Sequence, residues 1–316
     1  MSLAIREAAG DADLATYAAI VNAGSPEDPT SVAELRWSDA TYPGGLRLLA
    51  ERDGGAVGAA SVGRIYVHPP EYPYLWGTLD VLADARRQGI GTALLTRISA
   101  RAGADGRAGL HIPASAARPF AVEFLLHRGF EEHERMTALR LDLAGLVPPA
   151  ADPPTGVTIT TLAARPDLVT GVHQVALEAF ADIPGGDEPM TVGDLAEFRA
   201  RDVDRDSIPA DAFFIALESS TGRVIGYSSL MLTPGSTTSA WYDMTAVLRA
   251  WRGRGVAVAL KHATIGWAIG RGLVALDTGN DLANAPMRAV NEKLGFRPLP
   301  DLLTLRGPLF GGMMTS

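Results

Sequence analysis

Two short runs of arginine and glycine have the residue types and spacing to hold a phosphate group. Residues 252–257 read Arg-Gly-Arg-Gly-Val-Ala and residues 86–91 read Arg-Arg-Gln-Gly-Ile-Gly, and each run follows a short apolar stretch and opens an apolar-periodic helix. The first backbone N–H groups of a helix have no partner within it, and the helix dipole favours anions there. Glycine lets the backbone approach closely, and arginine adds charge-assisted hydrogen bonds. The two runs therefore predict a phosphate-bearing cofactor, held at one or two related sites.

The chain consists of two similar halves. Gly89 and Gly255 are 166 residues apart (255 − 89), and the glycines of two Gly-Phe pairs, Gly129 and Gly295, have the same separation (295 − 129). The acidic, proline-containing segments 27–35 and 187–195 also match, at an offset of 160 (187 − 27). Three matches in the same order indicate a duplicated domain. The proline-rich segment 147–156 is the expected linker, which predicts one domain at 1–146 and a second at 157–316.

Each half has the pattern of a mixed α/β domain. An opening strand and two helices precede three strands, which we expect at 46–51, 56–62 and 75–82 and again at 212–218, 224–232 and 240–248. The helix after the second glycine run has the i, i+3, i+4, i+7 apolar stripe at Val256, Ala259, Leu260 and Ala263. A further strand (109–112 and 273–278) and a helix ending at the Gly-Phe pair complete each half. We therefore predict two tandem domains, each a mixed, mostly antiparallel sheet flanked by helices.

Three kinds of phosphate-binding loop compete for the glycine runs. A Walker A loop needs lysine and a hydroxyl residue after its last glycine, and neither run has them. A dinucleotide fingerprint needs a third glycine, and hairpins stand where its βαβ unit should begin. The order of the elements and the Arg-x-x-Gly-x-Gly/Ala spacing resemble the GNAT superfamily of acyl-CoA-dependent N-acetyltransferases, most specifically over residues 245–261 and 280–296. The two-copy layout is similar to that of the mycothiol synthases.

The resemblance implies acetyl-CoA as acyl donor and a splayed sheet in each domain. In that family the strand before the run separates from its neighbour and pairs with the pantetheine arm, while the run holds the pyrophosphate. In the second half the residues so implied are Thr245, Ala246, Val247 and Asn284 for the thioester and pantetheine, and Arg252, Gly253, Arg254, Gly255, Val256 and Ala257 for the pyrophosphate. The matching residues of the first half are Leu79, Asp80, Val81, Arg86, Arg87, Gln88, Gly89, Ile90 and Gly91.

The two halves differ where the resemblance places the pantetheine. The second half has Asn280, Asn284 and Asn291, whereas the first half has Ala114, Arg118 and Leu125 at the equivalent positions. Asparagine is also a common helix cap and turn residue, which is the alternative interpretation of this ladder. Loss of all three asparagines favours a degenerate, supporting first domain and a catalytic second one. The intact glycine run of the first domain leaves cofactor binding open there.

The chain has no cysteine, which excludes an acetyl-cysteine intermediate and favours direct attack of an amine in a ternary complex. An amine of pKa about 10.4 is neutral only about one part in a thousand at pH 7, so a base is worthwhile. Asp243 is our first candidate, because strict alternation along its strand puts it on the same face as Val247. A strand-edge carboxylate bonded to backbone is the alternative. A backbone N–H near Val247 could stabilise the oxyanion.

Three alternatives remain open in the sequence for the fate of the leaving thiolate. The family often has a tyrosine four residues before the glycine of the Gly-Phe pair, and here Asn291 and Leu125 take that position. Tyr242 or water could replace it, or the thiolate could leave unprotonated, since a thiol pKa is near 8.5. Three acidic residues, Asp182, Asp187 and Glu188, lie in a loop that would cap the acceptor site. They could bind a cationic substrate, or form an ordinary solvated loop.

Composition limits the partners and the compartment. The net charge of −8 argues against nucleic-acid and membrane-surface partners. No cysteines means no disulfides and no thiolate metal site, and we expect no metal. Nothing near residue 1 has the pattern of a signal peptide and no apolar run approaches the roughly 20 residues of a membrane span, so we expect a cytoplasmic protein, monomeric or homodimeric.

The sequence thus predicts an N-acetyltransferase acting on a small-molecule primary amine. Two alternatives stay open: a non-catalytic acyl-CoA-binding or regulatory protein, and a nucleotide-dependent enzyme. The acceptor itself is not specified, and an antibiotic, an amino acid, a polyamine and a protein N-terminus are all compatible with the residues.

Overall fold

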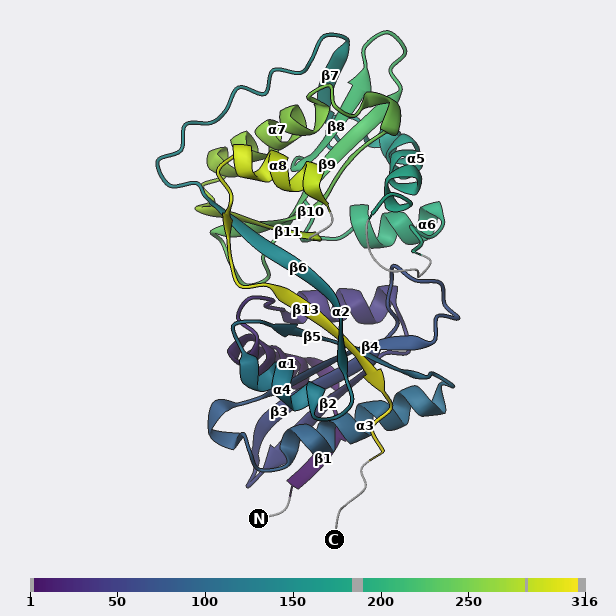
Figure 1. Ribbon diagram of the computed structural model, residues 1–316, viewed down its shortest axis with the longest axis vertical. Coiled ribbons are helices and arrows are strands. Elements are labelled where there is room, and N and C mark those ends of the chain that lie inside the picture. The colour runs from purple at the N-terminus through teal and green to yellow at the C-terminus, as the bar shows by residue number, and fades with distance from the viewer. Residues whose placement is uncertain (1–2, 184–189, 282–283, 312–316) are drawn as a thin grey trace. The chain divides into compact units, whose positions relative to one another are not determined.

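The computed structural model describes residues 3–183, 190–281 and 284–311 (Figure 1). The chain divides into two compact units. Unit 1 comprises Met1–Arg135 together with Asp301–Ser316, and unit 2 comprises Met136–Pro300. Each unit contains one of the two glycine runs.

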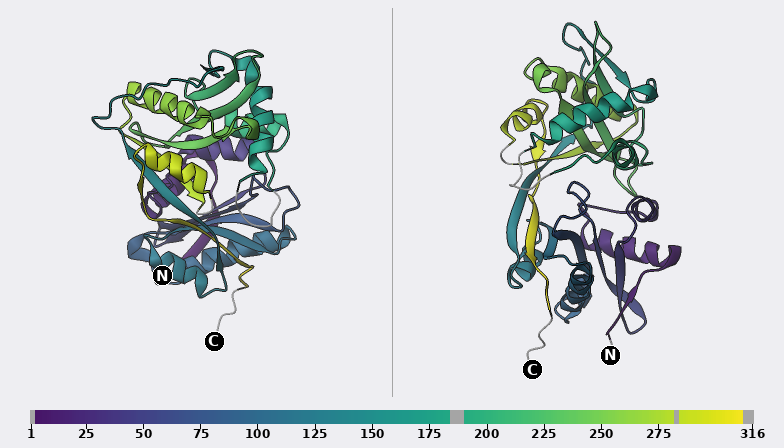
Figure 2. Two further views of the ribbon diagram at one scale, coloured as in Figure 1. Left: turned by 45° about the horizontal axis from the view of Figure 1, so that its top comes forward. Right: turned by 90° about the vertical axis from the view of Figure 1, so that its right-hand side faces the viewer.

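Unit 1 is a mixed sheet covered by helices on both faces. Its elements are β1 (Leu3–Glu7), α1 (Gly10–Gly24), α2 (Val32–Thr41), β2 (Leu46–Arg52), β3 (Gly55–Gly63), β4 (Tyr74–Val81), a short helix at Ala83–Ala85, α3 (Ile90–Ala104), β5 (Gly109–Ser115), α4 (Pro119–Leu126) and β13 (Leu302–Pro308). The strand order is β1-β2-β3-β4-β5-β13, and β4–β5 is the parallel pair. The blue helix α3 and the purple helix α1 lie on opposite sides of the unit 1 strands (Figure 2). Neighbouring residues of β3 accordingly point to opposite sides, because Ala60 packs in a cluster with residues of α3 and Ala59 packs in one with residues of α1.

Unit 2 repeats this arrangement. Its elements are β6 (Glu131–Asp142), β7 (Val157–Thr161), a short helix at Pro166–Leu168, α5 (Val169–Phe180), α6 (Leu195–Phe198), a π-helical turn at Arg199–Val203, β8 (Phe213–Glu218), β9 (Val224–Leu232), β10 (Ser239–Val247), a short helix at Arg249–Trp251, α7 (Val256–Gly270), β11 (Ala275–Asp281), α8 (Ala285–Lys293) and β12 (Arg297–Pro298). The strand order is β7-β8-β9-β10-β11-β6, with β12 also paired to β6. The predicted fold class is confirmed: both sheets are mixed, mostly antiparallel and flanked by helices.

Each unit receives one strand from the opposite half of the sequence. β6 follows α4 of unit 1, yet its residues Met136–Asp142 pair with β11 of unit 2. β13 follows the helices of unit 2, yet it pairs with β5 of unit 1 over Leu302–Pro308. The division into units therefore differs from a cut at residues 147–156, because that segment lies inside unit 2. β6 falls within the predicted first domain and β13 within the predicted second, yet β6 pairs with a strand of unit 2 and β13 with a strand of unit 1.

The helix after each glycine run packs on the centre of its own sheet. In unit 1, α3 buries Leu94, Leu95 and Ile98 completely. In unit 2, α7 buries Val256, Leu260 and Ile265 to 1 % exposure or less. Burying such side chains gives about 1.5–3 kcal/mol each, so these helices are firmly held and can position the loops that precede them.

Candidate functional site

The central sheet of unit 2 splits where the parallel pairing of β10 with β11 ends. β10 pairs with β11 over Ser239–Trp241 and Ala275–Asp277. Beyond that point Tyr242–Val247 pairs with β9 on one side, and within the described residues it has no strand partner on the other. Backbone groups along a strand must find partners, so this half of β10 offers donors and acceptors to an extended ligand.

Unit 1 has the same opening. β4 pairs with β5 over Tyr74–Trp76 and Gly109–His111, and Gly77–Val81 then pairs with β3 alone among the described residues. The duplication inferred from the sequence therefore extends to the split in each sheet.

The glycine runs form matching loops at the start of α7 and α3. Gly255 and Gly89 precede the helices with φ of 86° and 81°, a left-handed conformation that glycine adopts without strain. Arg252 Nε donates to the carbonyl of Val247 at 2.9 Å, and Arg86 Nε donates to Val81 at 3.0 Å. In the part of the chain that the structure describes, no side chain caps either helix. The first N–H groups of both helices are thus available to an anion, which fits a pyrophosphate.

The two loops differ at one strained position. Gly253 has φ of 72°, and the equivalent residue of unit 1, Arg87, has φ of 62°. A non-glycine residue in this region is uncommon and strained. Only unit 2 has the residue best suited to this backbone.

Asp182 is engaged with arginines and not open to a substrate. Its carboxylate lies 2.7 Å from Arg252 Nη1 and accepts from Arg249 Nε at 2.7 Å. These contacts hold the pKa of Asp182 at about 2. The predicted role of Asp182 in binding a cationic substrate is therefore not favoured, because its charge is already neutralised. Asp187 and Glu188, predicted with it, lie outside the described residues.

The predicted thioester residues alternate across the sheet. Gly226, the strand partner of Val247, faces α7, because a Cβ there would lie 3.4 Å from Leu260 and 3.2 Å from Val247. Thr245 shares this face and its Oγ1 lies 2.8 Å from Ser228 Oγ. We call this side of the sheet the α7 face, and the opposite side, covered by α5 and α6, the α5 face.

Asp243 lies on the α5 face, and the expectation that it shares the face of Val247 is wrong. The pairing of β10 with β9 shifts register between Tyr242 and Met244, so Asp243 is an extra residue in a β-bulge. Its carboxylate accepts from Ser229 Oγ at 3.0 Å, and Ser229 alternates with Ser228 to the α5 face. The β3–β4 pairing of unit 1 shows no such register shift. The bulge and its carboxylate belong to unit 2.

The surroundings of Asp243 favour its protonated form near neutral pH. Burial raises its pKa to about 7, with a further increase from the carboxylate of Asp202. Asp202 sits in the π-helical turn, where Arg201 Nη2 donates to it at 2.7 Å. Ser229, Arg205 and Arg201 act in the opposite direction and lower the pKa of Asp243. A carboxylate poised near pH 7 is suited to proton transfer.

Tyr242 and Asp243 are not brought together. The Tyr242 hydroxyl is buried on the α7 face, where it lies 2.7 Å from Thr264 Oγ1 and donates to the Lys261 carbonyl at 3.4 Å. Burial raises the pKa of Tyr242 well above its ordinary value. The hydroxyl is thus committed to α7, on the face away from the Asp243 carboxylate.

Two of the three asparagines form a buried pair. Asn291 Nδ2 donates to Asn280 Oδ1 at 2.5 Å, and Asn291 Oδ1 is buried without a hydrogen-bond partner among the described residues. Asn284 acts as a helix cap, the alternative interpretation of these asparagines, because its Oδ1 accepts from Met287 N at 3.3 Å at the start of α8.

In unit 1, an ion pair links the opening to α1. Arg118 precedes α4 and donates to Ser25 Oγ at 2.9 Å and to the Gly24 carbonyl and Glu27. Its guanidinium lies 3.8 Å from Asp80 on β4, which also accepts from Ser25 at 2.8 Å. Burial raises the pKa of Asp80 to about 6. Arg118 therefore replaces the asparagine of unit 2 with a charge that already has partners.

Aromatic side chains also surround the glycine run of unit 1. The guanidinium of Arg86 lies 4.4 Å from the centroid of the Phe120 ring, and Phe124 lies 3.4 Å from where a Cβ on Gly91 would be. The unit 1 residues predicted to bind a cofactor thus lie beside aromatic rings of α4.

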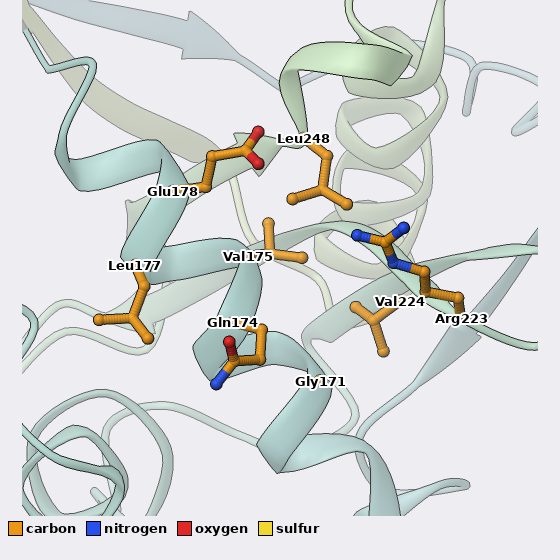
Figure 3. Close-up of a pocket in the computed structure, with 8 residues that line it drawn as sticks. All are labelled: Gly171, Gln174, Val175, Leu177, Glu178, Arg223, Val224 and Leu248. Atoms are coloured by element: carbon orange, nitrogen blue, oxygen red, sulfur yellow. The ribbon is translucent and has the colours of Figure 1, made fainter.

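A separate cavity of about 520 Å³ lies in unit 2 between α5 and the beginning of β9 (Figure 3). Its lining includes Gln174, Glu178, Arg223 and Leu248. Glu178 already accepts from the Arg249 backbone N–H at 2.6 Å. None of the predicted cofactor or catalytic residues is among the residues that line it.

Several residues at the site were missed from the sequence. Asp202 and Arg205 lie in a segment whose periodicity gives no sign of a π-helical turn. Lys261 could have been noticed, because it is one of two lysines in the chain and stands in an apolar helix. No group of histidine and acidic side chains suited to a metal occurs among residues 3–183, 190–281 and 284–311. Over the same residues, no helix has the length and apolar character needed to cross a membrane.

Comparisons with known proteins agree with this geometry, which defines a tandem pair of acyltransferase domains. A profile of the acetyltransferase (GNAT) family matches residues 177–296, and an acetyltransferase (GNAT) domain profile matches residues 43–132. Mycothiol acetyltransferases from Mycolicibacterium vanbaalenii and Catenulispora acidiphila are both 30 % identical to this chain, over 224 and 223 residues. These matches cover 70 % and 68 % of this chain but 63 % and 67 % of the relatives, so the chain spans less than two thirds of the first relative.

Solved structures show the same fold over nearly the whole chain. A tandem GNAT protein from the clavulanic acid biosynthesis pathway has a TM-score of 0.77 at 22 % identity and covers 98 % of this chain and 100 % of its own. A GCN5-related N-acetyltransferase from Sphaerobacter thermophilus has a TM-score of 0.73 at 20 % identity, with 98 % and 97 % covered. The chain belongs to the GNAT acetyltransferase family and carries two such domains in tandem. Acetyl transfer is the general reaction that this membership supports.

Proposed function

We propose that unit 2 transfers an acetyl group from acetyl-CoA to a primary amine of a small molecule, by direct attack in a ternary complex. The observation that carries the proposal is the combination, in unit 2, of an open β10 edge, an uncapped α7 N-terminus and the bulged Asp243. Acetyl-CoA would supply an activated thioester. The protein therefore needs to bind and orient the two substrates and to transfer protons.

Binding would use the backbone more than the side chains. The pantetheine amides would pair with the free half of β10 near Thr245, Ala246 and Val247, as a further strand pairs with a sheet edge. The pyrophosphate would accept from the N–H groups of Gly255 to Ala257 at the α7 N-terminus. Arg252, held beside this loop by the Val247 carbonyl and by Asp182, would donate a charge-assisted hydrogen bond to the pyrophosphate.

Asp243 would remove the proton from the attacking ammonium group. Its pKa of about 7 matches a base that works at neutral pH, and its carboxylate lies on the α5 face with Ser229. As the amine attacks, a backbone N–H of β10 would stabilise the oxygen of the tetrahedral intermediate. The chain's lack of cysteine is consistent with this single-displacement route.

The test is release of free CoA. The protein of residues 1–316 is incubated with acetyl-CoA and a panel of small amines, and free thiol is measured with a chromogenic reagent. Turnover with one or more amines, abolished in Asp243→Asn but not in the surface variant Arg271→Ala, is expected. CoA binding by calorimetry with no turnover on any amine would contradict catalysis.

A second function is favoured by one observation. Neither half has a tyrosine at the position where the family often places its acid, since Asn291 and Leu125 occur there. A non-catalytic acyl-CoA-binding protein would have this feature. Tight CoA binding that Asp243→Asn leaves unchanged, without turnover in either protein, would support it.

A further inference from the structure

Lys261 is a buried amine without a charged partner. It lies on α7 with 1 % of its surface exposed. Its Nζ is 3.6 Å from the centroid of the Tyr242 ring and 5.3 Å from that of Phe296. Within the described part of the chain it makes no ion pair or hydrogen bond, and burial alone lowers its pKa to about 7. Its titratable contact is Tyr242, whose own pKa is raised by burial.

The two aromatic contacts locate Lys261 at the closed end of the opening. Tyr242 is the first residue of β10 beyond Trp241, the last one paired with β11. Phe296 follows α8, and its N–H donates to the carbonyl of Asn291 at 3.1 Å. The Asn291 side chain donates to Asn280, which lies on β11 three residues beyond Asp277 (280 − 277), the last residue paired with β10, so its unsatisfied Oδ1 belongs to the same region. A donor without an acceptor and an acceptor without a donor border the place where β10 and β11 separate.

The fold does not require polar residues at these positions. At the offset of 166 residues, unit 1 has Leu95 where unit 2 has Lys261 (261 − 95), and Leu125 where unit 2 has Asn291 (291 − 125). Both leucines are buried in the core of unit 1. An unpaired buried cation destabilises a fold, and leucine fills the same place in the sister domain. The two polar residues of unit 2 are therefore better explained by a ligand than by packing.

We infer that Lys261 contacts the sulfur of acyl-CoA and protonates the thiolate as it leaves. The inference rests on the proposed function. When the tetrahedral intermediate collapses, the C–S bond breaks and its electron pair goes to sulfur, while the extra proton on the newly acylated nitrogen passes to solvent. The Lys261 ammonium gives its proton to that sulfur, which yields CoASH and a neutral lysine, and solvent returns the proton. Asn291 Oδ1 accepts from an N–H of the pantetheine and positions the thiol end.

The test measures the ionisation of bound CoA, not turnover. The ultraviolet absorbance of the thiolate is titrated with pH for CoA bound to the wild-type protein and to Lys261→Met. We expect the bound thiol pKa to fall by about 1–3 units in the wild type, as an opposite charge does for other acids, and to return to roughly 8.5 or above in the variant. CoA bound to unit 1 would contribute the same absorbance in the wild type and in Lys261→Met. The difference between their titration curves therefore reports on CoA bound to unit 2. Lys293→Met, which removes the exposed lysine of α8, serves as the matched control and should behave as wild type.

A purely structural lysine would give the opposite stability result. If Lys261 serves the ligand, Lys261→Leu without CoA should melt at a higher temperature than the wild type at pH 7, while kcat falls roughly 100-fold. A lower melting temperature with an unchanged thiol pKa would overturn the inference. If both Lys261 variants fail to fold, the wild-type measurement is sufficient: an unshifted pKa of the bound thiol overturns the inference. CoA that fails to bind at all would instead contradict the proposed function.

Discussion

Replacing Asp243 by asparagine should remove activity and increase stability at the same time. The change keeps the shape of the side chain and its contact with Ser229 while deleting the base. Loss of general base catalysis lowers rates by about 10²–10⁴-fold, so kcat should fall by that factor. The wild-type pH–rate profile should rise through pH 7, where the carboxylate loses its proton, and this ascending limb should disappear in the variant.

The effect on stability follows from the same pKa. In the folded protein the carboxyl keeps its proton up to about pH 7, whereas the ordinary value is 3.8. The folded state therefore binds more protons than the unfolded state between these values, and stability falls as pH rises through this window. A difference of about 3 units is worth at most ~4 kcal/mol at 1.36 kcal/mol per unit. Urea unfolding should show Asp243→Asn more stable than the wild type at pH 8 and equal to it near pH 4.

Two neighbouring substitutions provide controls with opposite signs. Asp202→Asn removes a negative charge that raises the pKa of Asp243, so the ascending limb should move to lower pH. Ser229→Ala removes a hydrogen bond that lowers this pKa, so the limb should move to higher pH while the maximal rate is retained. If the limb stays near pH 7 in Asp243→Asn, or if both controls shift it in the same direction, Asp243 is not the base.

Three further predictions concern the cofactor loop and unit 1. Arg252→Ala should weaken CoA binding by tenfold or more, about 1.5–3 kcal/mol for a charge-assisted hydrogen bond, as measured by calorimetry; an unchanged affinity would exclude Arg252 from the site. Gly255→Ala should lower the melting temperature, because φ of 86° costs an alanine about 1–2 kcal/mol. Its control, Gly266→Ala, lies within α7 with nothing near the added Cβ and should raise the melting temperature. Equal shifts of the two melting temperatures would refute this reasoning. Arg118→Ala should destabilise the protein by about 3 kcal/mol at pH 8, because it leaves the Asp80 carboxylate buried without its cation. The destabilisation should be smaller at pH 5, where Asp80, with a pKa of about 6, is protonated. A loss of stability that is independent of pH in urea unfolding would contradict the ion pair.

The sequence predicted those parts of the fold that depend on local pattern. The positions of Gly89 and Gly255 need a left-handed backbone before a helix, and both glycines have it. The apolar stripe of Val256, Leu260 and Ala263 faces the core, as helical periodicity requires. Because the two copies repeat these signals at one offset, the duplicated α/β domain could be recognised without a structure.

The rest depends on contacts between residues distant in sequence. The sequence of β10 gives no sign of an inserted residue, because its pattern of residues remains compatible with regular alternation. The bulge that moves Asp243 to the α5 face could therefore not be predicted from the sequence. Asp182 looked like an open loop carboxylate because its partners, Arg249 and Arg252, lie 67 and 70 residues further along the chain (249 − 182 and 252 − 182). The exchange of β6 and β13 has no local signature at all, since strand pairing is decided by the tertiary fold.

The exchange of strands sets the order in which the protein can be completed during synthesis. β5 ends at Ser115, but its neighbour β13 starts at Leu302. At about 5–20 residues per second, the ribosome needs roughly 10–40 s to make the intervening chain. All residues of unit 2 precede Asp301, so the domain encoded second is fully synthesised before the last strand of unit 1. Meanwhile β5 presents an unpaired edge, which is a site for aggregation. The nascent chain is thus most exposed to misassembly in the half that was translated earliest.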